Sequence, residues 1–343
     1  MRPTVKDVAA RANVSPKTVS NVLGGTITVA PETRTRVERA IEELGYVPNL
    51  AARGLRSGRT GIIALVVPDL RTPFSAELTQ YFVELAHERG LGVQLEQSWS
   101  DPARTRELIA AARRHLVDGV VLNPITVAQR DVALSTGAGV PLVMLGEVLQ
   151  DEVDQIWVDS VEAARRITRY LIGLGHRRIA MLGVQDPEEG TVTGRLRQEG
   201  YRAALIESGL PVRPELERSC SAWSPAGGFG AMTALLDEVG VPDAVFCATD
   251  SIAIGALSAL WSAGLRVPHD VSVVGFDDVD DAAYASPPLT TIRFDKRAYA
   301  ETALDRLILR IEGSTAPAEQ IVFPVEIIHR ASAARRTASA ERT

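Results

Sequence analysis

Ten polar or aromatic residues stand in loops at the ends of stretches that we expect to form β-strands. They are Asp69, Phe74, Ser75, Asn123, Glu147, Thr193, Arg197, Trp223, Thr249 and Asp277. An aromatic ring can stack on the face of a pyranose, while carboxylates, amides, hydroxyls and a guanidinium can hydrogen-bond to sugar hydroxyls. The set therefore favours the binding of a small polar ligand such as a sugar.

Each of these residues also has an ordinary structural explanation. Arg197 could be a surface arginine at the start of a helix, and Trp223 could cover an edge of the core, which is the commoner role of a tryptophan. Asp277 begins an acidic run that could be a solvated loop. Taken singly, each residue is better explained in this way, so the interpretation depends on the elements that position the residues.

A second set of side chains, near the N-terminus, has the chemistry to contact nucleic acid. Pro16, Lys17, Ser20 and Asn21 form the outer face of an expected short helix. Lysine and asparagine can hydrogen-bond to base edges in a major groove, as the side chains of a recognition helix do. The alternative is a small three-helix core with a solvated face, and the pattern alone leaves both open.

Three helices are expected to hold this second set. Thr4 begins a capping-box pattern before the first helix, Ser15 caps the second, and the third begins near Pro31 and stops at Gly45. Two short helices joined by a tight turn, with a third in support, describe a helix-turn-helix.

Beyond residue 60 the chain alternates apolar runs with amphipathic stretches. The predicted strands are 62–67, 93–96, 119–122, 142–145, 155–158, 178–182, 244–247 and 271–274, and the predicted helices include 74–89, 104–115, 161–172, 196–208, 251–263 and 295–312. This alternation predicts an α/β fold of two doubly wound parallel-sheet subdomains. Ligands of such folds bind at the carboxyl ends of the strands, where the ten residues stand.

Charge is divided unevenly along the chain. The total is −6, but residues 1–60 carry ten Lys or Arg against five acids, which gives +5 there and leaves −11 for the remainder. A basic segment on an acidic body suggests nucleic-acid binding, although a short basic segment also arises by chance.

Composition and motifs argue against other classes of protein. With 343 residues, 45% hydrophobic and 23% charged, the chain is expected to be a globular protein of two or three domains. We expect no transmembrane helix, no secretory signal and no disulfide framework from its two cysteines, which favours a cytoplasmic location, associated with the nucleoid. The sequence holds no nucleophile elbow, Walker A run or metal-ligand spacing, so we expect no catalytic residue, no metal and no cofactor.

The stretches TVKDVAARANVSPKTVSNVL and PETRTRVERAIEELGYVPNLAARGLRSGRTGIIALVVPD closely resemble the lactose-repressor (LacI/GalR) family of bacterial transcription regulators. The resemblance continues to about residue 330. It implies a DNA-binding head and, behind it, a ligand cleft between two lobes similar to those of periplasmic sugar-binding proteins. It also implies that Pro16, Lys17 and Asn21 meet the bases, and that Leu55 levers open the minor groove at the centre of the operator.

The implied DNA-binding set is Thr4, Ser15, Pro16, Lys17, Thr18, Ser20, Asn21, Asn49, Arg53 and Leu55. The family's effector-contacting positions match Phe74, Ser75, Arg197, Trp223, Thr249 and Asp277. Four departures stand out. Asn13 replaces a frequent glycine, Gly54 weakens the hinge helix, Thr249 replaces a frequent asparagine, and Gly146 replaces a frequent aspartate for which Glu147 could substitute.

We therefore predict four segments: a helix-turn-helix domain (1–47), a hinge (48–60), an effector-binding and dimerisation core of two interleaved lobes (61–330), and a disordered tail (331–343). The hypothesis is a homodimeric repressor of a carbohydrate-catabolism operon. It would bind a near-palindromic double-stranded DNA operator under the control of a sugar or sugar derivative. The alternatives are a purine, nucleoside or co-repressor effector, a solute-binding protein, or a sugar- or nucleoside-modifying enzyme. The sequence does not name the effector, the operator or the regulated genes.

Overall fold

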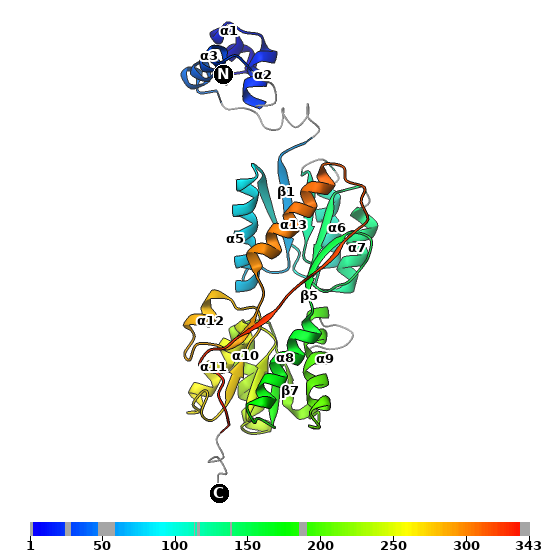
Figure 1. Ribbon diagram of the computed structural model, residues 1–343, viewed down its shortest axis with the longest axis vertical. Helices are drawn as coiled ribbons and strands as arrows, with labels where there is room; N and C mark the ends of the chain where they lie inside the picture. The colour runs from blue at the N-terminus through cyan, green and yellow to red at the C-terminus, as the bar shows by residue number, and fades with distance from the viewer. Residues whose placement is uncertain are drawn as a thin grey trace. The chain divides into compact units, whose positions relative to one another are not determined.

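The computed structural model of the chain describes residues 3–24, 29–46, 59–112, 114, 117–137, 139–184 and 191–336 (Figure 1). The chain divides into two compact units, Met1–Thr60 and Gly61–Thr343. The division coincides with the change from a basic to an acidic composition. Within the described residues, no helix has the length and apolar character needed to cross a membrane.

The N-terminal unit contains the three predicted helices, α1 (Val5–Ala12), α2 (Pro16–Gly24) and α3 (Pro31–Leu44). The backbone N–H and the hydroxyl of Thr4 both donate to Asp7 Oδ2, at 2.8 and 2.7 Å, which fixes the start of α1. At the start of α2, Ser15 Oγ accepts a 3.1 Å bond from the backbone N–H of Thr18. These bonds satisfy donors that a helix leaves unpaired in its first turn.

The apolar faces of the three helices form one small core. Its buried residues are Val8, Ala9, Ala12, Val19, Val22, Val37, Ala40 and Tyr46. The turn between α1 and α2 is made by Asn13, whose φ of 53° is left-handed. Asparagine tolerates this conformation better than most residues with a side chain, which explains how it can stand where glycine is frequent.

The second unit contains two lobes, each built on a parallel sheet. The sheet of the first lobe has six strands in the order β11-β5-β4-β3-β1-β2. They are β1 (Ile62–Val67), β2 (Gly92–Gln97), β3 (Gly119–Leu122), β4 (Leu142–Leu145), β5 (Asp154–Val158) and β11 (Gln320–Phe323). All neighbouring pairs run parallel, as predicted for an α/β fold.

Helices cover both faces of this sheet: α5 (Pro73–Glu88), α6 (Pro102–Ala111), α7 (Val127–Gly137) and α13 (Lys296–Ile311). Alternate residues of β1 point to opposite faces. Leu65 packs in the cluster that contains α5 and α13, while Val66 packs in the cluster on the other face. Because β1 is buried on both faces, its sequence is a continuous run of apolar residues.

The second lobe has a four-stranded parallel sheet in the order β7-β6-β8-β9. Its strands are β6 (Ile179–Val184), β7 (Glu217–Ser219), β8 (Ala244–Cys247) and β9 (Ser272–Val274). Its helices are α8 (Ser160–Gly173), α9 (Val192–Glu207), the short η2 (Pro214–Leu216), α10 (Pro225–Glu238), α11 (Asp250–Ser262) and α12 (Asp280–Tyr284). Helix α9 packs with α8, and α10 packs with α11.

The chain passes between the lobes three times. It leaves the first lobe after β5, returns through β10 (Thr291–Arg293) to α13 and β11, and leaves again through β12 (Glu326–Ile328). Strands β10 and β12 pair antiparallel where two of these passages run together. In Figure 1, α13 accordingly lies beside α5 although the whole second lobe separates them in sequence.

The C-terminal segment corrects one prediction. The prediction of a disordered tail over 331–343 is wrong for residues 331–336, which pack on the second lobe, while residues 337–343 lie outside the described residues. Ser332 is fully buried, where its hydroxyl donates to Val273 O (2.6 Å) and its carbonyl accepts from Val273 N (2.8 Å). Farther along, Ala334 O contacts His176 Nε2 at 3.1 Å, and Arg336 pairs with Asp243 at 3.0 Å. Ser332 and Ala333 are buried there, although the composition of this segment resembles that of a tail.

Helices α10 and α11 pack closely enough to require glycine. A Cβ on Gly228 would stand 2.1 Å from Ile252 O, and one on Gly255 would stand 2.0 Å from Pro225 O. Gly230, also on α10, is exposed and has no atom within 4 Å of its Cβ position.

This contrast gives a matched pair of substitutions. Gly228→Ala should lower the free energy of unfolding by about 1–3 kcal/mol, because the helices must separate. Gly230→Ala should raise it by roughly 0.5–1 kcal/mol, because alanine costs less chain entropy in a helix. Chemical denaturation of both variants measures the two effects. Equal effects of the two substitutions would contradict the close packing of α10 on α11.

Candidate functional site

A cavity of about 420 Å³ opens between the two lobes of the second unit, at the carboxyl ends of strands from both sheets. All ten residues that the sequence singled out for ligand binding line it. The first lobe contributes residues that follow β1, β3 and β4, and the second contributes residues that follow β6, β7, β8 and β9. Its size falls in the usual range for small-molecule pockets.

Arg197, on α9, is the buried cation of the pocket, with 6% of its side chain exposed. It donates through Nη1 to the carbonyl of Ala248, and its Nη2 lies 3.3 Å from Asp277 Oδ1. Its guanidinium carbon lies 3.5 Å from the centre of the Phe276 ring. A buried cation requires this kind of compensation, because it has lost its hydration. The alternative of a surface arginine is therefore wrong.

Glu147 joins polar groups of the two lobes by hydrogen bonds. It follows β4 of the first lobe, and both of its carboxylate oxygens accept hydrogen bonds from the second lobe. Ser160 Oγ donates to Oε1, and Thr193 Oγ1 donates to Oε2 at 2.6 Å. Ser160 in turn lies 3.3 Å from Arg197 Nε. Together with Ser160 behind them, the lining residues Glu147, Thr193 and Arg197 form a connected set of polar groups that joins the two lobes.

Asp277 combines a strained backbone conformation with a raised carboxyl pKa. Its φ of 106° is a conformation that residues with side chains rarely adopt, and such strain concentrates at functional sites. Burial raises the pKa of Asp277 to about 6, against the opposing influence of Arg197 and Lys296 and in concert with Glu147. Asp250 also faces it and is itself buried. The alternative of a solvated loop is therefore wrong for Asp277.

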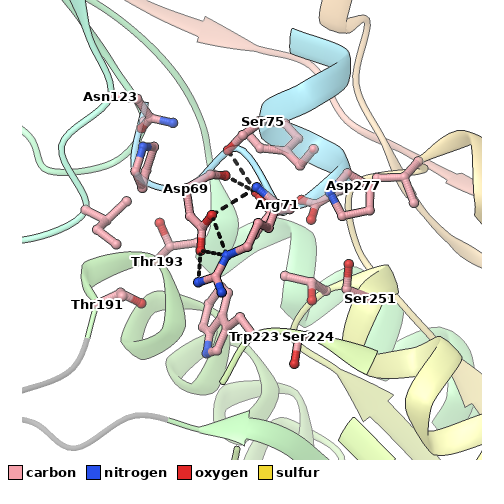
Figure 2. A pocket seen from close by; sticks show the side chains of 18 of the residues that line it. Asp69, Arg71, Ser75, Asn123, Thr191, Thr193, Trp223, Ser224, Ser251 and Asp277 are labelled. Atoms are coloured by element: carbon pink, nitrogen blue, oxygen red, sulfur yellow. Dashed lines mark hydrogen bonds and ion pairs between the residues drawn. The ribbon is translucent and has the colours of Figure 1, made fainter. Parts of the chain in front are cut away.

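Asp69 and Arg71 form an ion pair at the part of the pocket supplied by the first lobe (Figure 2). Arg71 Nε lies 3.1 Å from both carboxylate oxygens, and Nη2 lies 2.7 Å from Oδ2. The backbone N–H of Arg71 also donates to Oδ1 at 2.9 Å. These bonds lower the pKa of Asp69 and raise that of Arg71, so both groups stay charged near neutral pH.

The remaining predicted residues supply apolar and hydroxyl surface. Phe74 packs against Phe294 with ring centres 6.0 Å apart, and Trp223 is half-buried in the wall. Thr249 caps α11 through a 3.3 Å bond from Ile252 N, so part of its hydrogen-bonding capacity is already used. Asn123 and Ser75 also line the cavity. Aromatic and polar groups therefore face the same space.

Gly146, which stands where the resemblance implies a frequent aspartate, has a backbone conformation that favours glycine. Gly146 has a φ of 82°, and a Cβ there would stand 3.2 Å from Asn123 Oδ1. Its N–H donates to Tyr299 Oη at 2.9 Å, and the hydroxyl of Tyr299 donates to Ile156 O at 2.6 Å. An aspartate would be strained in this conformation. The carboxylate of Glu147 lines the pocket next to it.

Several lining residues were missing from the predicted set. Ser251 follows β8 closely, in the first turn of α11, so the strand-end rule could have found it. Arg71 stands in the same loop as Asp69, but a loop arginine alone does not signal a pocket. Phe294 directly follows β10 and Tyr299 lies in α13, and no sequence pattern placed these two residues beside the other loops.

The residues predicted to contact DNA fall into two groups. Seven lie in the described part of the N-terminal unit: Thr4, Ser15, Pro16, Lys17, Thr18, Ser20 and Asn21. Asn49, Arg53 and Leu55 lie outside the described residues. Pro16 and Lys17 are exposed on α2, and the side chains of Lys17 and Asn21 have no partner in the described part of this unit. Ser15, Thr18 and Ser20 are engaged in local bonds at the start of the helix.

Metal binding has no support within the described ranges, because no three His, Cys, Asp or Glu side chains gather there as ligands. The described cysteines do not indicate a reactive site either. Burial raises the pKa of the Cys220 thiol to about 11 and that of Cys247 well above its usual value, so both are held as thiols.

Known proteins match both units. Residues 4–49 match the bacterial regulatory proteins of the lacI family, and residues 168–333 match the periplasmic binding protein-like domain. The HTH-type transcriptional regulator CelR of Thermobifida fusca is 37% identical over 340 residues, covering 96% of this chain and 98% of that protein.

Two solved structures are similar over nearly the whole chain. A complex of the transcriptional regulator CelR with cellobiose has a TM-score of 0.71 and 34% identity, and covers 96% of this chain and 100% of that one. The lac repressor dimer bound to operator and the anti-inducer ONPF has a TM-score of 0.86 and 29% identity, covering 97% and 100%. With its three-helix N-terminal unit and its two-lobed pocket, this chain belongs to the LacI family of DNA-binding transcription regulators, which are not enzymes.

Proposed function

We propose that this chain is a repressor of a carbohydrate-catabolism operon that acts as a homodimer in the cytoplasm, bound to the nucleoid. A sugar or sugar derivative in the interlobe pocket controls its affinity for the operator. The observation that carries this proposal is the convergence of ten separately predicted residues on one cavity.

The DNA-binding part of the proposal rests on α2. Lys17 is exposed there, and Asn21 stands one turn farther along the same helix. Side chains that have no partner among the described residues of their unit are available to donate to base edges. The +5 charge of residues 1–60 would add sequence-independent attraction to phosphates. We further propose, from the sequence, that Asn49, Arg53 and Leu55 contact the operator centre, with Leu55 as an apolar wedge.

The effector part rests on the chemistry of the pocket wall. Trp223 and Phe74 offer aromatic surface, while Asp277, Asn123 and Asp69 offer acceptors for hydroxyl groups. The complex of CelR with cellobiose supports a carbohydrate in the equivalent region of this chain. The same aromatic rings could stack on a purine, so nucleosides belong in any ligand screen.

Control of DNA binding requires that the effector favour one arrangement of the two lobes over another. Glu147 makes such a preference possible, because its carboxylate joins hydroxyls of the opposite lobe. A ligand that replaces these bonds with its own changes the free energy of lobe closure. The proposal is tested by fluorescence anisotropy on an operator obtained by selection from random DNA, with sugars and nucleosides as added ligands. Failure of every sugar to change operator affinity would refute a sugar effector.

Lys17→Ala should reduce affinity for the selected operator by about ten- to a hundredfold and relax the preference at one base pair of each half-site, because a base contact is lost. Selection from random DNA with each variant measures the preference. Arg36→Ala, which removes an exposed charge from α3, is the matched control and should leave the preference intact. A uniform loss across all sequences for Lys17→Ala would make Lys17 a phosphate contact instead.

Asp277→Asn should weaken effector binding by about tenfold or more, because a hydrogen bond to a charged acceptor is lost. In the unmodified protein, affinity should fall about fourfold from pH 7.5 to pH 5.5, because the carboxylate that accepts from a sugar hydroxyl becomes protonated as the pH falls through about 6.

Titration calorimetry with the inducing sugar at both pH values measures these changes. Asp281→Asn, an exposed change in the same acidic run, should behave as the unmodified protein. If Asp277→Asn retained the full pH dependence, another group would be responsible for it.

A further inference from the structure

The charged side chains of the pocket include more acids than bases. Among the described residues that line it, five side chains carry charge: Asp69, Arg71, Glu147, Arg197 and Asp277. Three are acids and two are bases. Building on the function proposed above, we infer that the effector carries no negative charge, and that the ion pair between Asp69 and Arg71 makes the pocket reject acidic and phosphorylated sugars.

Each cation of the pocket already has a carboxylate partner. Arg197 is buried and already faces Asp277, the Ala248 carbonyl and the Phe276 ring. Arg71 has two of its three nitrogens on Asp69 in a bidentate arrangement. A phosphate or carboxylate that bound either guanidinium would stand beside the carboxylate that already pairs with it. Like charges at such distances repel strongly in a partly dehydrated site.

The acids are less fully compensated than the cations. Glu147 is buried, yet its carboxylate accepts its hydrogen bonds from the hydroxyls of Ser160 and Thr193, which are neutral. The lining therefore retains one negative charge more than its cations balance. This surplus adds to the repulsion of an anionic ligand, while a neutral sugar meets only hydrogen-bonding groups.

Arg71 would otherwise attract anions. Its side chain is 87% exposed, and an exposed arginine is a strong binder of phosphate and carboxylate. Asp69 cancels this attraction from only two residues away, and the backbone bond from Arg71 N to Asp69 Oδ1 keeps the two groups in one turn. Because the side chain of Arg71 is exposed, the effect of the pair lies in cancelling charge rather than in stabilising the fold.

The neutral pair also suits a sugar hydroxyl group. Arg71 Nη1 has no hydrogen-bond partner among the described residues and can donate, while the carboxylate of Asp69 can accept through its remaining lone pairs. A hydroxylated ring can thus use both members of the pair without separating them. The pair would therefore set the charge selectivity of the site and still contribute to binding.

Two matched pairs of ligands test this inference: cellobiose with cellobionate, and glucose with glucose 6-phosphate. Titration calorimetry on the full chain should show the neutral member of at least one pair binding at least about tenfold more tightly than its anionic partner. Asp69→Asn frees Arg71 and should shift this ratio towards the anion by at least about fivefold. Arg71→Gln removes the cation and should shift it the other way.

Asp131→Asn is the control, because it breaks an Arg–Asp pair of similar geometry with Arg130 outside the pocket. It should leave the ratio unchanged, and thermal melting should show all variants folded. An anionic sugar that bound as tightly as its neutral partner would overturn the inference while leaving a sugar effector in place. An unchanged ratio in Asp69→Asn would overturn the role of the pair. If no sugar of either kind bound or altered operator affinity, the proposed function itself would fall.

Discussion

The buried guanidinium of Arg197 imposes the strongest constraint on the pocket. A cation inside a protein must be surrounded by acceptors or its burial is prohibitively unfavourable. Here the acceptors come from separate places: the carbonyl of Ala248 after β8, the carboxylate of Asp277 after β9, and the hydroxyl of Ser160 at the start of α8.

Because all of these groups must converge on one side chain, the loops that carry them have little freedom to move independently. The strained backbone of Asp277 is consistent with this. The surrounding bonds hold its carboxylate in place, and the same bonds position the surface that a ligand meets. Through Ser160 the constraint reaches Glu147 and hence the first lobe, so the pocket and the arrangement of the lobes depend on one electrostatic requirement.

The sequence predicts the parts of this molecule that are buried on both faces. The limits of β1, β3, β4 and β8 agree with the predicted strands residue for residue, because strands at the centre of a parallel sheet are continuous apolar runs. The predicted helices do not include α10, because its glycines lower its helix propensity. The same glycines allow α10 to approach α11 closely. Short edge strands such as β11 and β12, which are half exposed, also lack a clear pattern.

For the pocket, the strand-end rule and the family resemblance were enough to choose ten lining residues. The hydrogen bonds and ion pairs that these residues form could not be predicted in the same way. That Asp69 holds Arg71, or that Glu147 reaches Ser160, depends on backbone directions within loops. The residues after 330 show the same limit, since their small side chains gave no sign that Ser332 is buried against Val273.

The interleaving of the lobes has a consequence for synthesis on the ribosome. The first lobe is begun at β1 but completed only by α13 and β11, which are made after the whole second lobe. Until then, the face of its sheet that Leu304 and Leu307 cover is open to solvent. The nascent first lobe therefore keeps an apolar face exposed during synthesis of the second lobe, whereas the N-terminal unit can fold as soon as it has been made. A chain that stops before α13 would have a complete DNA-binding unit attached to an aggregation-prone sheet.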